Sequence, residues 1–488
     1  MYKIGFDSDK YIGKQSEKII ERVNKFENKL YLEVGGKLVD DLHAARVLPG
    51  FNPNSMLQIL KTLTDKTEII LAISATDIEK NRMQGDQGIT YGDDLLRLLD
   101  LLKINNLYVS GIVITKFAYQ EPANLFKKRL ERVGIPVFVH YMLKDYPMDI
   151  KLVMSENGFG KNEYIKTTRP LVVVAASGSS SGKMAVCLSQ LYHEMKHGVK
   201  AGYAKFEKFP IWNLSLKHPI NLAYEASTAN INDINIIDPY HLEAYGAVAT
   251  SYNRDVEGFS ILDTIFKEIW GESPYKSPTD MGVNLLKECI TDDEICQNAA
   301  KQEIIRRYYK TTCEDWIYGS KDSEVEKIEL LMQGAGITKY DREVVGLAKS
   351  KAEETNTPSV AIKLPNGKII TGKTTPLLGA PSAAIVNALK TLAGLNDSIK
   401  LISPAMIEPI QKLSSDYLEN NNPQLSTVEL LIALAISTVT NPTVEFVLEQ
   451  IPKLKNSEAH SSVILSNADL QTFHKLGINI TCEPEQRL

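Results

Sequence analysis

The sequence has few cysteines, no long apolar run and no strong excess of either charge. It contains five cysteines in 488 residues, and no CxxC pair occurs among them. This scarcity argues against a cysteine-rich zinc site and fits the reducing cytosol. No run of 18 apolar residues occurs, and residues 1–7 lack an apolar core of signal-peptide length. We therefore predict a cytoplasmic protein without a transmembrane helix.

The charge balance argues against another broad class of function. Lysine and arginine number 55 against 60 aspartates and glutamates, which gives a net charge of -5. Such mild acidity argues against a general nucleic-acid or membrane-surface binder. The hydrophobic content of 43% is that of a globular protein. A chain of this length is too long for one ordinary core, so we expect several domains, and we expect a homo-oligomer.

The first part of the chain alternates strand and helix patterns, which predicts an α/β fold built from parallel βαβ units. The expected strands are 29–34, 68–73, 107–115 and 136–141, and the expected helices are 55–63, 93–103 and 121–133. A strand at 171–175, a helix at 182–196 and a strand at 199–206 follow them. The sequence leaves open whether these later strands join the same sheet.

The rest of the chain divides into two regions. Residues 217–354 are mostly helical in pattern, as at 292–307, and predict a helical domain or a large helical insertion. The polar stretch that ends in Asn356-Thr357-Pro358 marks a boundary. A second α/β domain is expected beyond it, with a hairpin at 360–372, a helix at 381–393, a strand at 399–402 and a helix opening at Ser403-Pro404. The predicted domains are 1–216, 217–354 and 355–488.

Two segments resemble the phosphate-binding pattern G-x-x-x-x-G-K-[ST]. Residues 367–374 match every position, but Asn366-Gly367 is a hairpin signal and no helix is expected to start at Lys373. Residues 177–184 match less well, because Ser177 replaces the first glycine and Met184 replaces the hydroxyl residue. A buried strand precedes this second segment and a helix follows it. We favour the second segment because its context is that of a P-loop.

The favoured loop predicts an anion site. Small residues let successive N–H groups converge on a phosphate, and a helix N-terminus adds partial positive charge. Lys183 would reach the terminal phosphates of ATP or another nucleotide, whereas Mg²⁺ must be held by other groups or not be used, since Met184 has no hydroxyl. An ordinary turn rich in serine and glycine is the alternative. The predicted ligand-binding residues are Gly178, Ser179, Ser180, Ser181, Gly182, Lys183 and Met184.

Charged residues in the later segments are candidates for chemistry. Glu207 follows the strand expected beside the loop strand, and Asp238 and Asp255 lie in polar segments further on. Carboxylates at the carboxyl ends of parallel strands face the ligand crevice. With Lys183, these three carboxylates are the predicted catalytic residues, acting as metal ligands or as a base. Helix caps and surface ion pairs are the alternative for each of them.

His193-Glu194-Met195-Lys196-His197 matches the zinc-protease pattern H-E-x-x-H. The match lies at the end of the helix that follows the loop, where cations suit the helix dipole just before Gly198. No third ligand stands out downstream. A zinc peptidase is therefore the least favoured of three hypotheses, and no metal ligand is predicted.

Several longer strings carry a resemblance to a known family. They include Glu33-Val34-Gly35-Gly36-Lys37-Leu38, Gly202-Tyr203-Ala204-Lys205-Phe206-Glu207 and Ser277-Pro278-Thr279-Asp280-Met281-Gly282. With the loop at Gly182-Lys183, they resemble domain-of-unknown-function family 1846, a bacterial and archaeal group, over essentially the whole chain. Some members are labelled ATP-dependent peptidases on account of the P-loop-like segment. The family loop reads Ala-Pro-Gly-Pro-Gly-Ser-Gly-Lys, so Ser177, Ser179 and Ser180 depart from it here.

The predicted C-terminal domain also resembles a cytidine-deaminase-type layer in its order of elements. The helix starts of zinc deaminases carry His or Cys ligands and a catalytic Glu. Here those places hold Ala380-Pro381-Ser382 and Ala405-Met406. The resemblance therefore implies a zinc-free relative of that fold without deaminase chemistry.

Two classes of function follow from the loop. The first is a nucleotide-dependent enzyme that transfers a phosphoryl group or hydrolyses an NTP. The second is a non-catalytic sensor or assembly scaffold for a small phosphorylated ligand, which Met184 favours because the usual Mg²⁺ hydroxyl is missing. In both, the expected partner is a small phosphorylated ligand, and neither nucleic acid nor a membrane is expected.

Overall fold

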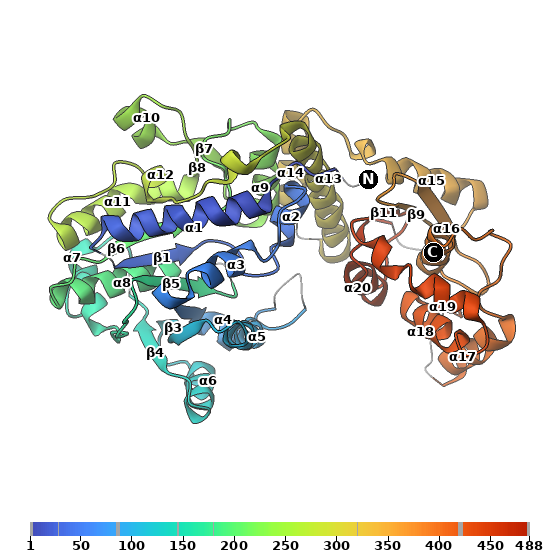
Figure 1. Cartoon of the computed structure of the whole chain (residues 1–488), viewed down its shortest axis with the longest axis horizontal. Helices are drawn as coiled ribbons and strands as arrows, with labels where there is room; N and C mark the ends of the chain where they lie inside the picture. The colour runs from blue at the N-terminus through green and yellow to red at the C-terminus, as the bar shows by residue number, and fades with distance from the viewer. Residues whose placement is uncertain are drawn as a thin grey trace. The chain divides into compact units, whose positions relative to one another are not determined.

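The computed structural model describes residues 3–27, 29–83, 88–143, 146–178, 180–319, 321–417 and 423–485 (Figure 1). The chain forms two compact units. One comprises residues 4–300, and the other comprises residues 301–488 together with 1–3. Each unit has its own sheet.

A six-stranded parallel sheet forms the centre of the unit 4–300, so the predicted parallel α/β fold is confirmed. Its strands are β1 (Leu30–Val34), β2 (Thr67–Ser74), β3 (Tyr108–Phe117), β4 (Val137–Tyr141), β5 (Leu171–Ala176) and β6 (Gly202–Phe206). Their order is β4-β3-β2-β5-β1-β6. The strand before the loop therefore shares the sheet with the earlier strands and lies between β1 and β2. Every residue of β2 is buried, which explains its continuous apolar run.

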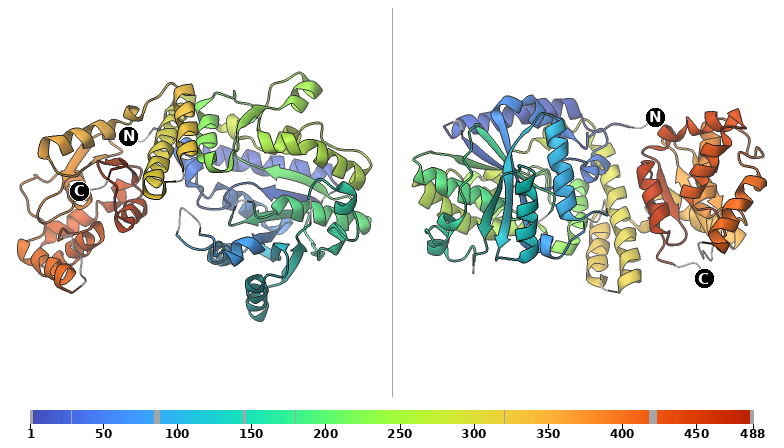
Figure 2. Two further views of the ribbon diagram at one scale, coloured as in Figure 1. Left: turned by 180° about the vertical axis from the view of Figure 1, so that it is seen from behind. Right: turned by 90° about the horizontal axis from the view of Figure 1, so that it is seen from below.

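Helices cover both faces of this sheet (Figure 2). The helices in this part of the chain are α1 (Ser8–Lys25), α2 (Leu42–Val47), α3 (Ser55–Thr62), α4 (Ala75–Glu79), α5 (Tyr91–Ile104), α6 (Glu121–Arg132), α7 (Ile150–Val153) and α8 (Lys183–Lys196). Further along lie α9 (Pro219–Ser227), α10 (Pro239–Tyr245), α11 (Asn253–Trp270) and α12 (Pro278–Met281), with the antiparallel strands β7 (Asn235–Ile237) and β8 (Thr250–Tyr252).

One hydrophobic core lies between the sheet, α8 and α11. Tyr31, Val172 and Tyr203 stand opposite one another on neighbouring strands and share this face. Leu191 from α8 and Phe266 from α11 pack against them, and both are almost fully buried. The burial of each such side chain stabilises the folded state by about 1.5–3 kcal/mol. This core fixes the start of α8 against the carboxyl ends of β1, β5 and β6.

Residues 217–300 pack in the same compact unit as the sheet. They bring α11 onto the sheet and include the short β7–β8 pair. The region is therefore mainly helical, as its pattern indicates, but it also contains two strands. The division into domains 1–216, 217–354 and 355–488 stays a prediction about independent folding. None of the helices in the described residues is both long and apolar enough to cross a membrane.

The unit 301–488 contains a four-stranded sheet in the order β10-β9-β11-β12. Its strands are β9 (Ser359–Lys363), β10 (Ile369–Lys373), β11 (Glu458–Ser461) and β12 (Asn479–Cys482). Its helices are α14 (Asp322–Gly334), α15 (Glu343–Thr355), α16 (Ala380–Leu392), α17 (Pro404–Asp416), α18 (Thr427–Ser437), α19 (Pro442–Leu448) and α20 (Asn467–Lys475), and α13 (Asp293–Tyr318) runs into it from the first unit. β9 pairs antiparallel with β10, so the predicted hairpin is confirmed.

The predicted strand at residues 399–402 is wrong. These residues form a bent loop, in which the N–H of Ile399 donates to the carbonyl of Asn396. Leu401 is buried in the core and anchors the loop there. The strands that extend the β9–β10 hairpin into a sheet are instead β11 and β12, which come later in the chain. A short apolar run can anchor a loop as well as form a strand, and periodicity does not separate the two.

Candidate functional site

The favoured loop lies at the carboxyl edge of the parallel sheet, where the strand order reverses. From β1 the chain crosses β5 to reach β2, whereas β6 lies on the other side of β1. Ligands of open α/β sheets bind outside the carboxyl ends of the strands at such a point. The loops that follow β1, β5 and β6 meet at this edge, and α8 begins there.

The loop between β5 and α8 is built from small residues for steric reasons. The Ser177 hydroxyl donates to the Tyr91 carbonyl at 3.0 Å, and a Cβ on Gly178 would lie 3.0 Å from the Tyr91 ring. Gly182 has a φ of +82° and precedes the first residue of α8, a conformation that favours glycine. Ser179 lies outside the described residues. Met184 lies in the first turn of α8 and packs partly against the core.

Two carbonyl groups of the loop are held by side chains of β3. The Thr115 hydroxyl donates to the carbonyl of Ser181 at 2.6 Å, and the Lys116 ammonium donates to the carbonyl of Ser180 at 2.8 Å. Within the described residues, the N–H groups of Ser181, Gly182 and Met184 have no hydrogen-bond acceptor. Pinned carbonyls and unpaired N–H groups are the arrangement that attracts an anion.

Two buried polar side chains beside these N–H groups also lack partners. The Ser181 side chain is 2% exposed, and its hydroxyl has no hydrogen-bond partner among the described residues. Lys183 is 9% exposed, and within the described residues its ammonium makes no hydrogen bond or ion pair. Burial lowers the pKa of Lys183, and the nearby carboxylates of Glu33 and Glu207 offset only part of this effect. A buried cation without an acceptor is costly unless a ligand provides one.

A row of charged residues lies on the sheet face that α8 covers. Glu33 on β1 stands opposite Lys205 on β6 in the strand register, and both are buried. The Tyr203 hydroxyl donates to Glu33 Oε2 at 2.6 Å. The apolar face of the sheet therefore becomes polar at its carboxyl edge, because Glu33 and Lys205 continue the alternation of Tyr31 and Tyr203.

Lys205 is the buried centre of a cluster of four side chains, in which Tyr252 is also buried and Glu207 and Asp255 are partly exposed. Its ammonium lies 2.6 Å from Asp255 Oδ2 and 2.9 Å from Glu207 Oε2, and it also donates to the Tyr252 hydroxyl. The Tyr252 hydroxyl in turn donates to Glu207 at 2.8 Å. Burial opposes the charge of Lys205, but Asp255 and Glu207 raise its pKa above the ordinary value. Burial and the neighbouring Asp255 raise the pKa of Glu207.

The structure brings together three of the four predicted catalytic residues. Lys183 interacts electrostatically with Glu207, and Lys205 joins Glu207 to Asp255. Asp238 lies elsewhere and caps α10, where it accepts from the Thr279 hydroxyl at 2.6 Å and from the His241 N–H at 3.0 Å. For Asp238 the geometry fits the helix-cap alternative.

Sequence reasoning missed Glu33 and Lys205 as members of the site. Both are charged residues within otherwise buried strands, and that contrast was the available signal. Their pairing could not be predicted, because the sequence does not show that β1 and β6 are neighbours.

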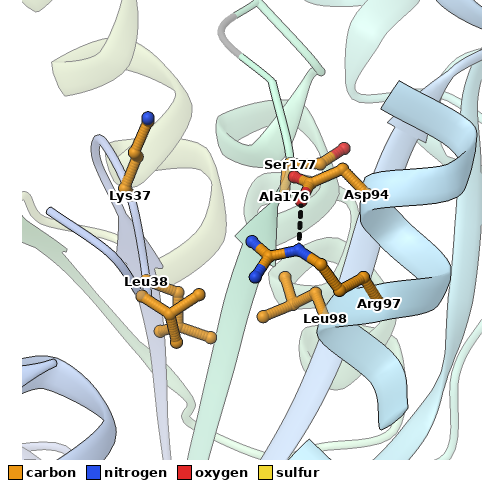
Figure 3. A pocket seen from close by; sticks show the side chains of 8 residues that line it. Lys37, Leu38, Asp94, Arg97, Leu98, Ala176 and Ser177 are labelled. Carbon is orange, nitrogen blue, oxygen red and sulfur yellow. Dashed lines mark hydrogen bonds and ion pairs between the residues drawn. The ribbon is translucent and has the colours of Figure 1, made fainter. Parts of the chain in front are cut away.

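A small hollow of about 20 Å³ lies beside the loop (Figure 3). Its lining residues are Lys37, Leu38, Val39, Asp94, Arg97, Leu98, Ala176 and Ser177. Arg97 donates to Asp94 at 3.0 Å and to Asp40 at 3.0 Å, so its guanidinium already has two acceptors. This volume holds about one water molecule, which makes the hollow too small for a nucleotide.

Sequence comparison connects this site to a family. The description "Domain of unknown function DUF1846, N-terminal" matches residues 4–336, and the corresponding C-terminal description matches residues 340–487. The chain belongs to the DUF1846 family. Proteins named UPF0371 protein from Streptococcus thermophilus (strain ATCC BAA-491 / LMD-9) and Streptococcus pneumoniae (strain JJA) are 49% and 48% identical over 484 residues. Each comparison covers 99% of this chain and 98% of the relative, and the predicted resemblance is confirmed.

In this DUF1846 chain the H-E-x-x-H residues have separate structural partners. His193 Nε2 lies 2.9 Å from the carbonyl of Asn162, and the ring of His197 stacks on Tyr164. Glu194 is buried and accepts from the Tyr31 hydroxyl at 2.6 Å. Within the described part of the chain, no group of three or more His, Cys, Asp and Glu side chains is placed to hold a metal ion.

The segment that matches the Walker pattern at every position is a hairpin. Gly367 lies in the turn with a φ of +88°, and Gly372 lies in β10. A Cβ on Gly372 would come within 2.1 Å of the Ala384 nitrogen, so this glycine allows α16 to approach the strand. The next helix begins at Ala380, seven residues after Lys373 in the sequence.

Proposed function

We propose that this protein binds a phosphorylated small ligand, such as ATP or another nucleotide, at the loop between β5 and α8. The observation that supports it most is Lys183, a buried ammonium without a described acceptor at the first position of the helix. The unpaired N–H groups of Ser181 and Gly182 and the unpartnered Ser181 hydroxyl lie beside it in the sequence. Phosphate oxygens would satisfy all of these donors at once.

The carboxylates near Lys183 do not fit a magnesium ion held by the protein alone. Both oxygens of Asp255 accept from the Lys205 ammonium, and Glu207 accepts from Lys205 and Tyr252. A divalent ion would have to replace Lys205, and Met184 supplies no hydroxyl. This geometry favours binding without chemistry, in which the protein acts as a sensor or a scaffold.

A phosphoryl-transfer enzyme is the second candidate, and Glu207 is the observation that favours it. Its raised pKa suits an acid or base, and it lies within electrostatic reach of Lys183. Deaminase chemistry is not proposed, since α16 and α17 begin with Ala380-Pro381 and Pro404-Ala405, which offer no zinc ligand.

Calorimetric titration of the full chain with ATP, ADP and tripolyphosphate tests the proposal. We expect the wild-type protein to bind at least one of these probes, and Lys183→Ala to weaken binding about 10- to 150-fold, the loss of a charged hydrogen bond. Lys373→Ala is the matched control, because it removes the lysine of the other Walker-like segment. It should leave the affinity unchanged.

The proposal fails if the wild-type protein binds none of the three probes, or if Lys183→Ala binds them as tightly as the wild type. Release of phosphate or ADP in the same samples distinguishes the two candidates. Turnover that Glu207→Gln abolishes would support the enzyme, whereas binding without turnover supports the sensor or scaffold.

A further inference from the structure

Three aromatic side chains form a cluster at the carboxyl ends of β3 and β4. The ring centroids of Phe117 and Tyr119 are 5.4 Å apart, and Tyr141 lies 5.9 Å from each of them. Phe117 is buried, whereas Tyr119 is 67% exposed. We call these three residues the aromatic platform. It presents a large exposed ring that rests on a buried one at the ligand edge of the sheet.

The platform is held in a specific conformation. The pairing of β3 with β4 shifts in register between Ile114 and Phe117, and Tyr119 has a φ of +64°. A bulky residue in this left-handed region costs about 1–2 kcal/mol. The Ala118 N–H donates to Gln120 Oε1 at 2.8 Å, and α6 begins at the next residue. Packing alone gives no reason to hold an exposed tyrosine in a strained conformation, because the strain gains it little burial.

The same segment also contacts the phosphate loop. Lys116, with a φ of +51°, donates to the carbonyl of Ser180 at 2.8 Å. Tyr119 follows three residues later, so the chain can carry its Cα at most on the order of 10 Å from that of Lys116. Lys116 therefore joins the loop to the segment that carries Tyr119. The platform is therefore within reach of the other end of a ligand whose phosphates lie on the loop.

Aromatic rings are suited to planar partners. Stacking on a nucleobase requires an exposed ring face and no specific hydrogen bonds. The ammonium of Lys161 lies 4.3 Å from the centroid of the Tyr141 ring, so Tyr141 already has a cation against it. Tyr119 is the ring of the platform with the most exposed surface.

We propose that Tyr119 stacks on the base of a nucleotide whose phosphates occupy the loop of Lys183. The inference rests on the proposed phosphate site and extends it, because it selects a nucleotide over a phosphorylated sugar or inorganic phosphate. The loop supplies the charge recognition, and the platform supplies the recognition of a planar ring.

The test compares two probes on the full chain, ATP and tripolyphosphate. We expect ATP to bind more tightly than tripolyphosphate, and Tyr119→Ala to weaken ATP binding about 5- to 150-fold, the usual range for one stacked base. Tripolyphosphate affinity should be unchanged in this variant. Tyr119→Phe keeps the ring and should bind ATP as the wild type does. Tyr108→Ala is the matched control, a half-exposed tyrosine at the amino end of the same strand.

Two outcomes overturn the inference while leaving the phosphate site intact. In the first, tripolyphosphate binds in a Lys183-dependent manner, but ATP binds no more tightly. In the second, Tyr119→Ala binds ATP as the wild type does. If the wild-type protein binds none of ATP, ADP and tripolyphosphate, the proposed phosphate site itself has failed.

A second variant separates stacking from a structural role. Asparagine tolerates the left-handed region better than tyrosine, so Tyr119→Asn should keep or increase the thermal stability. The same variant should lose the ATP preference over tripolyphosphate. A loss of stability together with an unchanged ATP preference would show that Tyr119 is a packing residue and would overturn the inference.

Discussion

The two Walker-like segments of this chain differ in the part that their second glycine plays. In the imperfect match, Gly182 has a φ of +82° and turns the chain into α8. In the perfect match, Gly372 lies in an extended strand and makes room for Ala384 of α16. A glycine at the same motif position therefore allows a turn in one segment and close helix packing in the other.

The comparison shows that the backbone around a Walker-like segment determines whether its N–H groups can converge on an anion. Residues 177–184 have a buried strand before them, a helix after them and carbonyls pinned by Thr115 and Lys116. The first residues of the segment 367–374 lie in the hairpin turn, and the rest form β10, an edge strand that pairs with β9. Successive N–H groups of an extended strand point to opposite sides, so they cannot converge on an anion.

The largest expected effect is the loss of stability when Gly372 is replaced by alanine. Gly372→Ala forces a Cβ against the α16 backbone and should destabilise the unit 301–488 by about 3 kcal/mol. Gly182→Ala should cost about 1–2 kcal/mol, the penalty of the left-handed conformation. Urea unfolding with hydrogen exchange of β5 and β10 measures each separately.

Gly346→Ala is the control for the first of these changes. Gly346 lies in α15, and a Cβ there has no atom within 4 Å, so it should be neutral or stabilise the unit by about 1 kcal/mol. If Gly182→Ala proves the more damaging of the two substitutions, the roles assigned to these glycines are reversed.

Removal of the hydrogen bond that pins the loop should have a smaller effect. Thr115→Val keeps the shape of the side chain but deletes the donor to the Ser181 carbonyl, which should cost about 1 kcal/mol of stability. Because that carbonyl can then turn inward, tripolyphosphate binding should weaken by several-fold. Calorimetry checks the affinity, and unchanged binding would show that the pinned carbonyl is unimportant.

The smallest expected effect is an increase in the stability of the ligand-free protein. Lys183→Met removes a buried charge and should raise the urea midpoint of the ligand-free protein at neutral pH, since burial lowers the pKa of Lys183. Between the lowered folded-state pKa and the unfolded value, the folded protein binds fewer protons than the unfolded chain, so wild-type stability rises with pH through that window. This part of the rise should be missing in Lys183→Met, and an identical pH profile would contradict it. Lys373→Met is the exposed control.

Local pattern predicted most of the fold. The ten elements expected between residues 29 and 206 all form, since strong apolar runs and capped helices are set by neighbouring residues. Helix α1 was not predicted, although Tyr11, Gln15, Ile19 and Val23 are buried at four-residue spacing, because Gln15 interrupts the apolar stripe. The order of the strands depends on long-range pairing and could not be predicted.

The candidate site also has a part that local sequence predicts and a part that depends on long-range contacts. The loop was predicted, since its signal is contiguous in the sequence. The cluster around Lys205 draws on residues 205, 207, 252 and 255, and Glu33 joins it from β1. Only the fold shows which of these charged residues are neighbours. Asp238 and Asp255 both lie in polar segments, so sequence alone offers no reason to prefer one. The structure distinguishes them, because Asp238 caps a helix by accepting from the His241 N–H.

The position of β5 also determines when the sheet can be completed during synthesis. β1 pairs only with β5 and β6 among the described strands, and both are made at least 130 residues later in the order of translation. Until residue 171 has left the ribosome, β1 has no partner in the sheet and β2 has an open edge. Open strand edges favour aggregation, so the nascent chain is exposed to it until β5 has been made. The loop that follows β5 is therefore assembled in the same late step that closes the sheet.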